Sequence, residues 1–237
     1  MGQCMSIVNK VVTEIQKQEQ EAKDGHSQNA AAPATSSGSP APTKGSSIAM
    51  HGSLPSGVEE IGCKSVYDGD TLTLSDGRRV RLLGIDTPEL KEKQPFAEEA
   101  KEYTNSRCYK QQLFVYPEPG GEKTDHYDRT LAHIFVKKGD KYLCINEGIV
   151  EAGFARFYTP KDVKLHNETR LRKAQDKAMA AKRGLWSTFA DETVCRTRNG
   201  TAYHKSSCEH VQGRNPQDIL ASKAIAQGLH PCRTCFE

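Results

Sequence analysis

Three carboxylates and two arginines stand at spacings that could serve the hydrolysis of a phosphodiester bond. Asp70 and Asp86 are two carboxylates that could hold a hard cation, and Glu89 follows three residues later. Arg81 lies between the two aspartates, and Arg129 follows in the segment Y-D-R-T-L-A. Hydrolysis of this bond needs an activated water and positive charge where the phosphate becomes more anionic. The two arginines suit the second need, because a guanidinium can grip two phosphate oxygens at once.

The local sequence predicts how these residues meet. D-G-D-T at 68–71 leads into a strand expected at 71–75, and S-D-G at 75–77 is a hairpin turn before a strand at 78–83. Pro88 prevents the second strand from continuing in a ladder. Hairpin pairing can therefore bring Asp70 and Asp86 together, and the backbone oxygen of Thr87 adds a ligand that suits Ca²⁺. Glu89 is placed to polarise a water on that ion.

The remaining pattern predicts the elements that position this set. Further strands are expected at 61–67, 112–116 and 131–136, and helices at 95–109, 145–152 and 167–183. Pro95 suits the first position of a helix, while Gly153 and Gly184 suit helix ends. Five short strands with interleaved helices predict an α+β fold, a small closed barrel carrying about three helices.

Composition divides the chain of 237 residues, of which only 36% are hydrophobic, into three parts. Residues 25–57 are rich in Ala, Ser, Pro and Gly and predict a flexible linker, because they cannot bury enough surface to offset the entropy of ordering. We therefore expect an N-terminal segment at 1–57, a barrel domain at 58–190 and a small module at 191–237. The net charge of +3 excludes a bulk basic field, so nucleic-acid contacts must come from local clusters.

Residues 60–190 resemble the staphylococcal nuclease-like (thermonuclease) domain. The resemblance rests on Y-D-G-D-T-L, V-R-L-L-G-I-D-T-P-E, T-D-H-Y-D-R-T-L-A-H-I-F, N-E-G-I-V-E-A-G-F-A-R and L-R-K-A-Q-D-K-A-M-A-A-K-R-G-L-W. It implies an OB-fold barrel with three helices and a Ca²⁺-dependent endonuclease that hydrolyses DNA and RNA. In that family, cleavage of the P–O5′ bond leaves 3′-phosphate ends.

The resemblance also implies roles for single residues. The calcium ligands fall on Asp70, Asp86 and the carbonyl of Thr87, and the acid that activates water falls on Glu89. The two arginines that stabilise the pentacoordinate phosphorus fall on Arg81 and Arg129.

Two tyrosines are carried over as phosphate-binding residues. Tyr127 matches the family motif, and Tyr158 is the nearest candidate for a later tyrosine in the segment F-A-R-F-Y-T-P-K. A lysine that is typical of the family is His126 here, which makes one phosphate contact weaker or dependent on pH.

The C-terminal part contains a pattern of metal ligands. His204 and Cys208 form H-x-x-x-C, and Cys232 and Cys235 form C-x-x-C, which together supply the four ligands of a structural Zn²⁺ site. The unit is too small to fold by apolar burial alone, so the metal would stabilise it. Rival ligands are His210, His230 and Cys195, and a disulfide at C-x-x-C is the alternative.

The N-terminus reads M-G-Q-C-M-S, which matches the N-myristoylation pattern at Gly2, with Cys4 available for a palmitoyl chain. Two acyl chains would hold the protein at the cytoplasmic face of the plasma membrane. No signal-peptide core is visible, and the scattered cysteines fit free thiols in a reducing compartment, so we expect a cytoplasmic monomer that is not secreted by a signal peptide.

A second interpretation remains open from the sequence. OB-fold barrels also bind single strands without cutting them, so the chain could be a non-catalytic nucleic-acid-binding or scaffold module. The complete set of carboxylates and arginines favours the enzyme.

Overall fold

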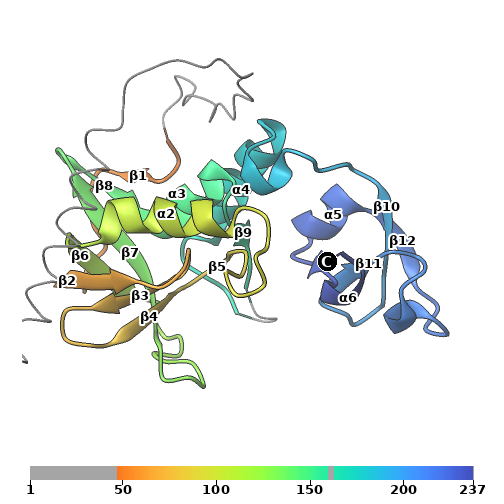
Figure 1. The fold of residues 1–237 in the computed structure, drawn as a ribbon, viewed down its shortest axis with the longest axis horizontal. Coiled ribbons are helices and arrows are strands. Elements are labelled where there is room, and N and C mark those ends of the chain that lie inside the picture. The colour runs from red at the N-terminus through yellow and green to blue at the C-terminus, as the bar shows by residue number, and fades with distance from the viewer. Residues whose placement is uncertain (1–46, 160–162, 237) are drawn as a thin grey trace, which may run out of the picture. The chain divides into compact units, whose positions relative to one another are not determined.

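The computed structural model describes residues 47–159 and 163–236 (Figure 1). Seven strands form one sheet in the order β1-β8-β7-β4-β3-β2-β6. Their bounds are β1 Met50–His51, β2 Glu59–Val66, β3 Thr71–Leu74, β4 Arg79–Leu82, β6 Gln112–Pro117, β7 Thr130–Lys138 and β8 Lys141–Cys144.

The sheet closes because β6 also pairs with β7, in the register Leu113↔Val136. The closed ring contains the five strands β2, β3, β4, β7 and β6, which confirms the predicted OB-fold barrel. Within the ring only β4 and β7 run parallel, in the register Val80↔Thr130, and the other pairs are antiparallel.

Three helices cover the barrel as predicted: α2 Ala97–Cys108, α3 Ile145–Ala152 and α4 Glu168–Ala180. Alternating strand residues such as Leu72, Leu74 and Val80 point inward and are fully buried. They pack with apolar residues of the helices, including Ala100, Ile149 and Leu171. Burial of each large side chain contributes about 1.5–3 kcal/mol, so this core holds the hairpin that carries the carboxylates.

Several boundaries differ from the prediction. The helix expected at 95–109 begins only at Ala97, because Phe96 adopts a left-handed conformation with φ 68°. The helix expected to reach residue 183 ends at Ala180. A short antiparallel pair, β5 Ile85–Asp86 and β9 Arg156–Phe157, was not predicted because neither partner carries a strand pattern of its own.

The predicted linker also differs from the structure, in which residues 47–57 are ordered. Met50 and His51 pair with β8, Ala49 is fully buried, and the carboxylate of Glu151 accepts hydrogen bonds from Ser47 Oγ and Ile48 N at 2.7 and 3.0 Å. These contacts come from partners about a hundred residues away, so no local pattern shows them.

The C-terminal module contains a second sheet in the order β12-β10-β11-β13. Its elements are β10 Thr193–Arg196, β11 Ala202–His204, the 3₁₀ turn Glu209–Val211, β12 Gln217–Leu220, α5 Ala221–Ala226, β13 His230–Pro231 and α6 Arg233–Phe236. Its apolar residues Val194, Tyr203 and Ala224 share one buried cluster with Ala178 of α4 and Trp186 of the 3₁₀ turn Gly184–Trp186. In the described part of the chain, no helix is both long and apolar enough to cross a membrane.

Candidate active site

The β3–β4 hairpin and the chain that follows it bring Asp70 and Thr87 into contact. Thr71 pairs with Arg81, and Leu82 N donates to the backbone oxygen of Asp70 at 2.8 Å. Thr87 donates twice to Asp70 Oδ2, from its backbone N at 3.2 Å and from Oγ1 at 2.9 Å. Asp70 and Thr87 are both 6% exposed, so this contact is shielded from water.

A glycine permits this close approach. A Cβ at Gly69 would lie 2.7 Å from Thr87 Cγ2 and 2.8 Å from Ala100 Cβ, closer than carbon atoms can pack. The backbone oxygen of Gly69 accepts a 2.6 Å hydrogen bond from Thr104 Oγ1 of α2. Helix α2 therefore fixes the turn that carries Asp70.

Arg81 lies between the two predicted metal-binding aspartates. Its Nη2 atom is 3.2 Å from Asp70 Oδ2 and 3.6 Å from Asp86 Oδ1, and its Nη1 atom donates to the carbonyl of Leu82 at 2.7 Å. The structure thus brings Asp70, Asp86, Thr87 and Arg81 into one site.

Asp68 is a fourth carboxylate of this site, and the sequence reasoning missed it. Its Oδ1 atom accepts hydrogen bonds from the backbone N of Asp70 at 3.1 Å and of Thr71 at 2.7 Å. Burial, together with the charge of Asp70, raises the pKa of Asp68 from 3.8 to about 6. The D-G-D turn was the available signal, because an aspartate at the start of a turn often caps the backbone two or three residues later.

The site contains more carboxylates than cations. Burial raises the pKa of Asp86, with Arg81 opposing that rise and Asp70 adding to it. Burial also raises the pKa of the more exposed Glu89, and the charges of Asp70 and Asp86 raise it further. A cation would relieve this repulsion, and a set of oxygen ligands alone suits a hard ion such as Ca²⁺.

Arg129 lies beside the site and contacts a different carboxylate. Arg129 directly precedes β7, and the parallel pairing of β7 with β4 sets Leu131, two residues later, opposite Arg81. Its Nε and Nη2 atoms both lie 2.7 Å from Asp125 Oδ2. Among the described residues, Asp125 is the only ion-pair partner of Arg129, so the structure places Arg129 near the carboxylates and not in contact with them.

The two predicted phosphate-binding tyrosines lie on different segments. Tyr127 is 66% exposed, and its ring centre lies 5.3 Å from the guanidinium carbon of Arg129. His126 packs on the Tyr127 ring at 3.9 Å between centroids. Tyr158 follows β9, donates from its backbone N to Gly84 O at 3.1 Å, and is 39% exposed.

The predicted zinc ligands converge in the C-terminal module. One ligand atom from each of His204, Cys208, Cys232 and Cys235 lies within 4.8 Å of the others. His204 Nδ1 is 3.5 Å from Cys208 Sγ, and Lys205 N donates to Cys235 Sγ at 3.4 Å. Every cysteine in the described ranges is a free thiol, so C-x-x-C forms no disulfide here.

The rival zinc ligands have other partners. Cys195 Sγ donates to Asp218 Oδ1 at 3.3 Å, and His210 Nε2 lies 2.9 Å from Thr234 Oγ1. His230 Nδ1 lies 3.1 Å from the carbonyl of Pro231.

A second cluster, Glu118, His133 and His166, has metal-like spacing but is held by hydrogen bonds. Glu118 Oε2 lies 2.9 Å from His133 Nε2 and 3.0 Å from His166 Nδ1. The side-chain amide of Asn167 lies 3.4 Å from His133 Nδ1 on the other side of the ring. Hydrogen bonds within the described residues therefore account for the cluster without a metal ion.

A third cluster contains His51, Cys144 and Glu147. Glu147 Oε2 is 2.8 Å from His51 Nε2 and 2.9 Å from Arg170 Nε, so its charge is already paired. Burial raises the pKa of the neighbouring Cys144 thiol well above 9.0, which keeps this sulfur protonated and unsuited to a metal.

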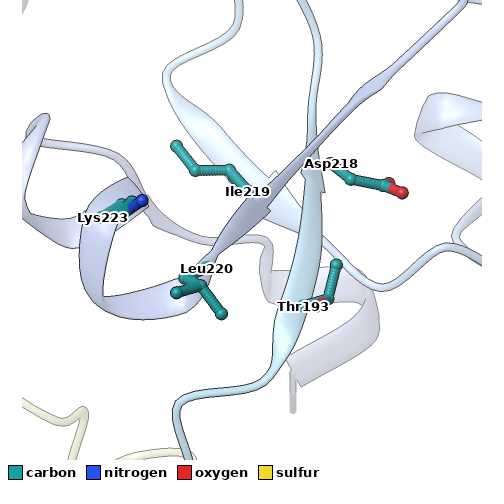
Figure 2. A pocket seen from close by; sticks show the side chains of 5 residues that line it. All are labelled: Thr193, Asp218, Ile219, Leu220 and Lys223. Carbon is teal, nitrogen blue, oxygen red and sulfur yellow. The ribbon is translucent and has the colours of Figure 1, made fainter.

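A hollow of about 350 Å³ on the C-terminal module is lined by Thr193, Asp218, Ile219, Leu220 and Lys223 (Figure 2). In Figure 2 these side chains point in different directions from β10, β12 and α5 and do not converge. It therefore offers no arrangement for chemistry.

Comparisons with known proteins agree with this geometry. Residues 79–188 match the family described as staphylococcal nuclease homologue. The chain is 33% identical over 132 residues to thermonuclease from Staphylococcus intermedius, an alignment that covers 52% of this chain and 73% of that protein. It is 31% identical over 114 residues to probable endonuclease LCL3 from Phaeosphaeria nodorum, covering 46% of this chain and 37% of that protein. The matched region thus spans most of the bacterial relative and well under half of the fungal one.

Proposed function

The chain belongs to the staphylococcal nuclease homologue family, and from this premise we propose that it is a hydrolytic nuclease that cuts DNA and RNA with the help of Ca²⁺. The observation that supports this most is the position of the Arg81 guanidinium between Asp70 and Asp86, at 3.2 and 3.6 Å. A guanidinium held only for structure needs a single carboxylate partner. Two carboxylates beside one guanidinium instead place groups that can bind a cation next to a group that can bind a phosphate.

Asp70, Asp86 and the carbonyl of Thr87 would hold the ion, which supplies a polarised water and positive charge next to the phosphate. Glu89 accepts the proton of the attacking water, a role that its raised pKa favours because a stronger base takes a proton more readily. The water oxygen bonds to phosphorus, the P–O5′ bond breaks, and the 5′ oxygen leaves with a proton, so the upstream product ends in a 3′-phosphate.

Arg81 and Arg129 stabilise the charge that develops on the phosphate oxygens. Arg81 is 17% exposed by its side chain and is oriented by the Leu82 carbonyl, so it needs little reorganisation. Asp125 orients Arg129 through its two contacts to Nε and Nη2, which leaves Nη1 to reach a phosphate. The exposed ring of Tyr127 flanks the same guanidinium.

The decisive experiment digests plasmid and single-stranded DNA and RNA with Ca²⁺, with a strong chelator, and with Glu89→Gln. We expect cleavage only by the wild type with Ca²⁺, and 3′-phosphate ends that resist extension by a polymerase until a phosphatase removes them. Glu98→Gln, which changes an exposed carboxylate in the first turn of α2, is the matched control. Full cleavage by Glu89→Gln, or in the chelator, would overturn the assignment, and binding without any cleavage would favour the scaffold alternative.

For the C-terminal module we propose a structural Zn²⁺ site. The donor set of three thiols and one imidazole suits a closed tetrahedral site, and the N–H of Lys205 pointing at Cys235 Sγ would stabilise a bound thiolate. Elemental analysis should find one zinc per chain in the wild type and in Cys63→Ser, and none in Cys232→Ser. Equal zinc in all three proteins would refute the site.

The acylation predicted at Gly2 and Cys4 lies outside the described residues. We propose that it places the enzyme at the cytoplasmic face of the plasma membrane, as the N-terminal pattern suggests. Intact mass measurement after expression in a eukaryotic host tests this, since an unmodified N-terminal glycine would exclude it.

A further inference from the structure

A basic groove of about 580 Å³ runs between the barrel domain and the C-terminal module, and the nuclease chemistry does not account for it. Tyr158, Lys164 and Arg172 line it from one side, and Arg196, Arg198 and His230 line it from the other. Its lining contains four basic side chains and one carboxylate, Glu168. The groove thus carries a local positive charge in a chain whose net charge is only +3.

The basic residues of the groove divide into two kinds. Arg172 is held in place, because Glu168 Oε1 lies 2.9 Å from its Nη2 and its Nη1 donates to Ala226 O at 2.9 Å. Arg196 is held by Gln227. Lys164 and Arg198 are exposed and have no ion-pair partner among the described residues. These two charges can therefore bind an anion without breaking an existing contact.

Aromatic rings add a second kind of contact. Tyr158 is 39% exposed, and its ring lies 6.1 Å from that of His230 at an angle of 63°. A base can stack on such an exposed ring, and stacking contributes about 1–3 kcal/mol for each base whatever its sequence. A positively charged groove that also offers exposed rings is the combination with which proteins bind a single nucleic-acid strand without sequence preference.

The groove leads toward the candidate active site through the segment that follows β9. Tyr158 directly follows β9, which pairs with β5 in the register Asp86↔Arg156. Because Asp86 is one of the predicted ion ligands, one end of the groove adjoins the strand pair that carries the candidate active site.

Buried apolar contacts hold the C-terminal module against α4 and the 3₁₀ turn Gly184–Trp186. Its buried residues Val194 and Ala224 share a cluster with Ala178 and Trp186, each at most 2% exposed. These buried contacts hold the side of the groove formed by the C-terminal module against α4.

We propose that the C-terminal module extends the nuclease site by a groove in which Lys164, Arg198 and Tyr158 bind a single nucleic-acid strand beside the bond that is cut. This inference rests on the proposed nuclease function for its substrate, and it deepens that function by assigning a second binding surface. The module therefore raises affinity for longer strands and does not take part in bond cleavage.

The test measures binding of a fluorescent single-stranded DNA of about 12 nucleotides, a length within the site size of OB-fold proteins. The full chain carries Glu89→Gln so that the strand stays intact, and binding is followed by anisotropy over a range of salt. One variant adds Lys164→Gln and Arg198→Gln. The matched control adds Lys137→Gln and Lys223→Gln, which remove the same charge from exposed positions outside the groove.

We expect the groove variant to bind roughly tenfold more weakly and its salt slope to fall by about 1.4, since each lost phosphate contact on a single strand removes about 0.7. The control should keep the wild-type slope. With Glu89 restored, the groove variant should raise KM for the long strand and leave kcat for a dinucleotide substrate unchanged. Zinc content and Tm confirm that each variant is folded.

Equal affinity of the groove variant and its control for the strand would overturn the proposed binding role of the groove. Failure of the proposed nuclease function would give a different result, namely no cleavage by the wild type with Ca²⁺. The binding assay would still show whether the groove binds a single strand.

Discussion

The Nη2 atom of Arg81 lies 3.2 Å from Oδ2 of Asp70, the same oxygen that accepts both hydrogen bonds from Thr87. One carboxylate oxygen therefore joins the arginine of β4 to the turn that carries Thr87. Because Arg81 also approaches Asp86, this contact places a phosphate-binding group directly beside the proposed ion site.

Removal of the Arg81 guanidinium should reduce catalysis more than folding. We expect Arg81→Ala to lower kcat by about 10²–10³, the usual cost of one charge-stabilising contact, and Arg81→Lys to recover only part of it. Steady-state cleavage of DNA measures this. Arg79→Ala on the same strand is exposed and serves as control, and undiminished turnover by Arg81→Ala would contradict the assignment.

Asp68 should lower the stability of the metal-free protein near neutral pH. Its folded pKa of about 6 lies above the ordinary 3.8, so its contribution to stability is present below 3.8 and is lost as the pH rises through 6. Asp68→Asn should therefore raise Tm at pH 7 in a chelator and change it little at pH 3.5.

With added Ca²⁺ at pH 7, the wild type should have a higher Tm than Asp68→Asn. The negative charge of Asp68 then stabilises the bound cation, and the variant lacks that charge. Thermal scans with and without Ca²⁺ measure both effects, with exposed Asp140→Asn as the control. A lower Tm for Asp68→Asn at pH 7 without Ca²⁺ would contradict the argument.

Gly69→Ala should weaken the ion site from a distance. The new Cβ would meet Thr87 Cγ2 at 2.7 Å and Ala100 Cβ at 2.8 Å, so Thr87 must move away from Asp70. We expect a loss of about 1–3 kcal/mol in stability from overpacking and weaker Ca²⁺ binding by calorimetry. At Gly52 a Cβ would meet nothing within 4 Å, so Gly52→Ala should leave both unchanged. Unaltered Ca²⁺ affinity in Gly69→Ala would contradict the role of this glycine.

The Glu118 cluster should make stability depend on acid pH. Burial alone would raise the pKa of Glu118, but hydrogen bonds from His133 and His166 outweigh it and lower the pKa from 4.5 to about 2. Its contribution is therefore full above 4.5 and is lost as the pH falls toward 2. Urea unfolding should show a larger difference between wild type and Glu118→Gln at pH 6 than at pH 2.5. An equal difference at both pH values would show that the hydrogen bonds do not stabilise the ionised form.

The local pattern of the chain was enough to predict the barrel and the central part of the site. The predicted helix at 145–152 matches α3, and the hairpin brings Asp70 and Asp86 to Arg81 as expected. These features depend on turn residues and alternation over a few positions, which act within a short stretch of chain. Within the proposed zinc site, each pair of residues lies in one short stretch of chain, whereas the two pairs meet because β11 pairs with β13.

Tertiary packing decided the rest. The segment at 47–51 joins the sheet through Glu151 and β8, and Trp186 shares its core with the C-terminal module. The groove from Lys164 to Arg198 exists only because that shared core brings two distant segments together. Spacing along a sequence determines which side chains share a turn, whereas contacts between distant segments depend on how complete elements bury their apolar faces, and only the folded chain contains that information.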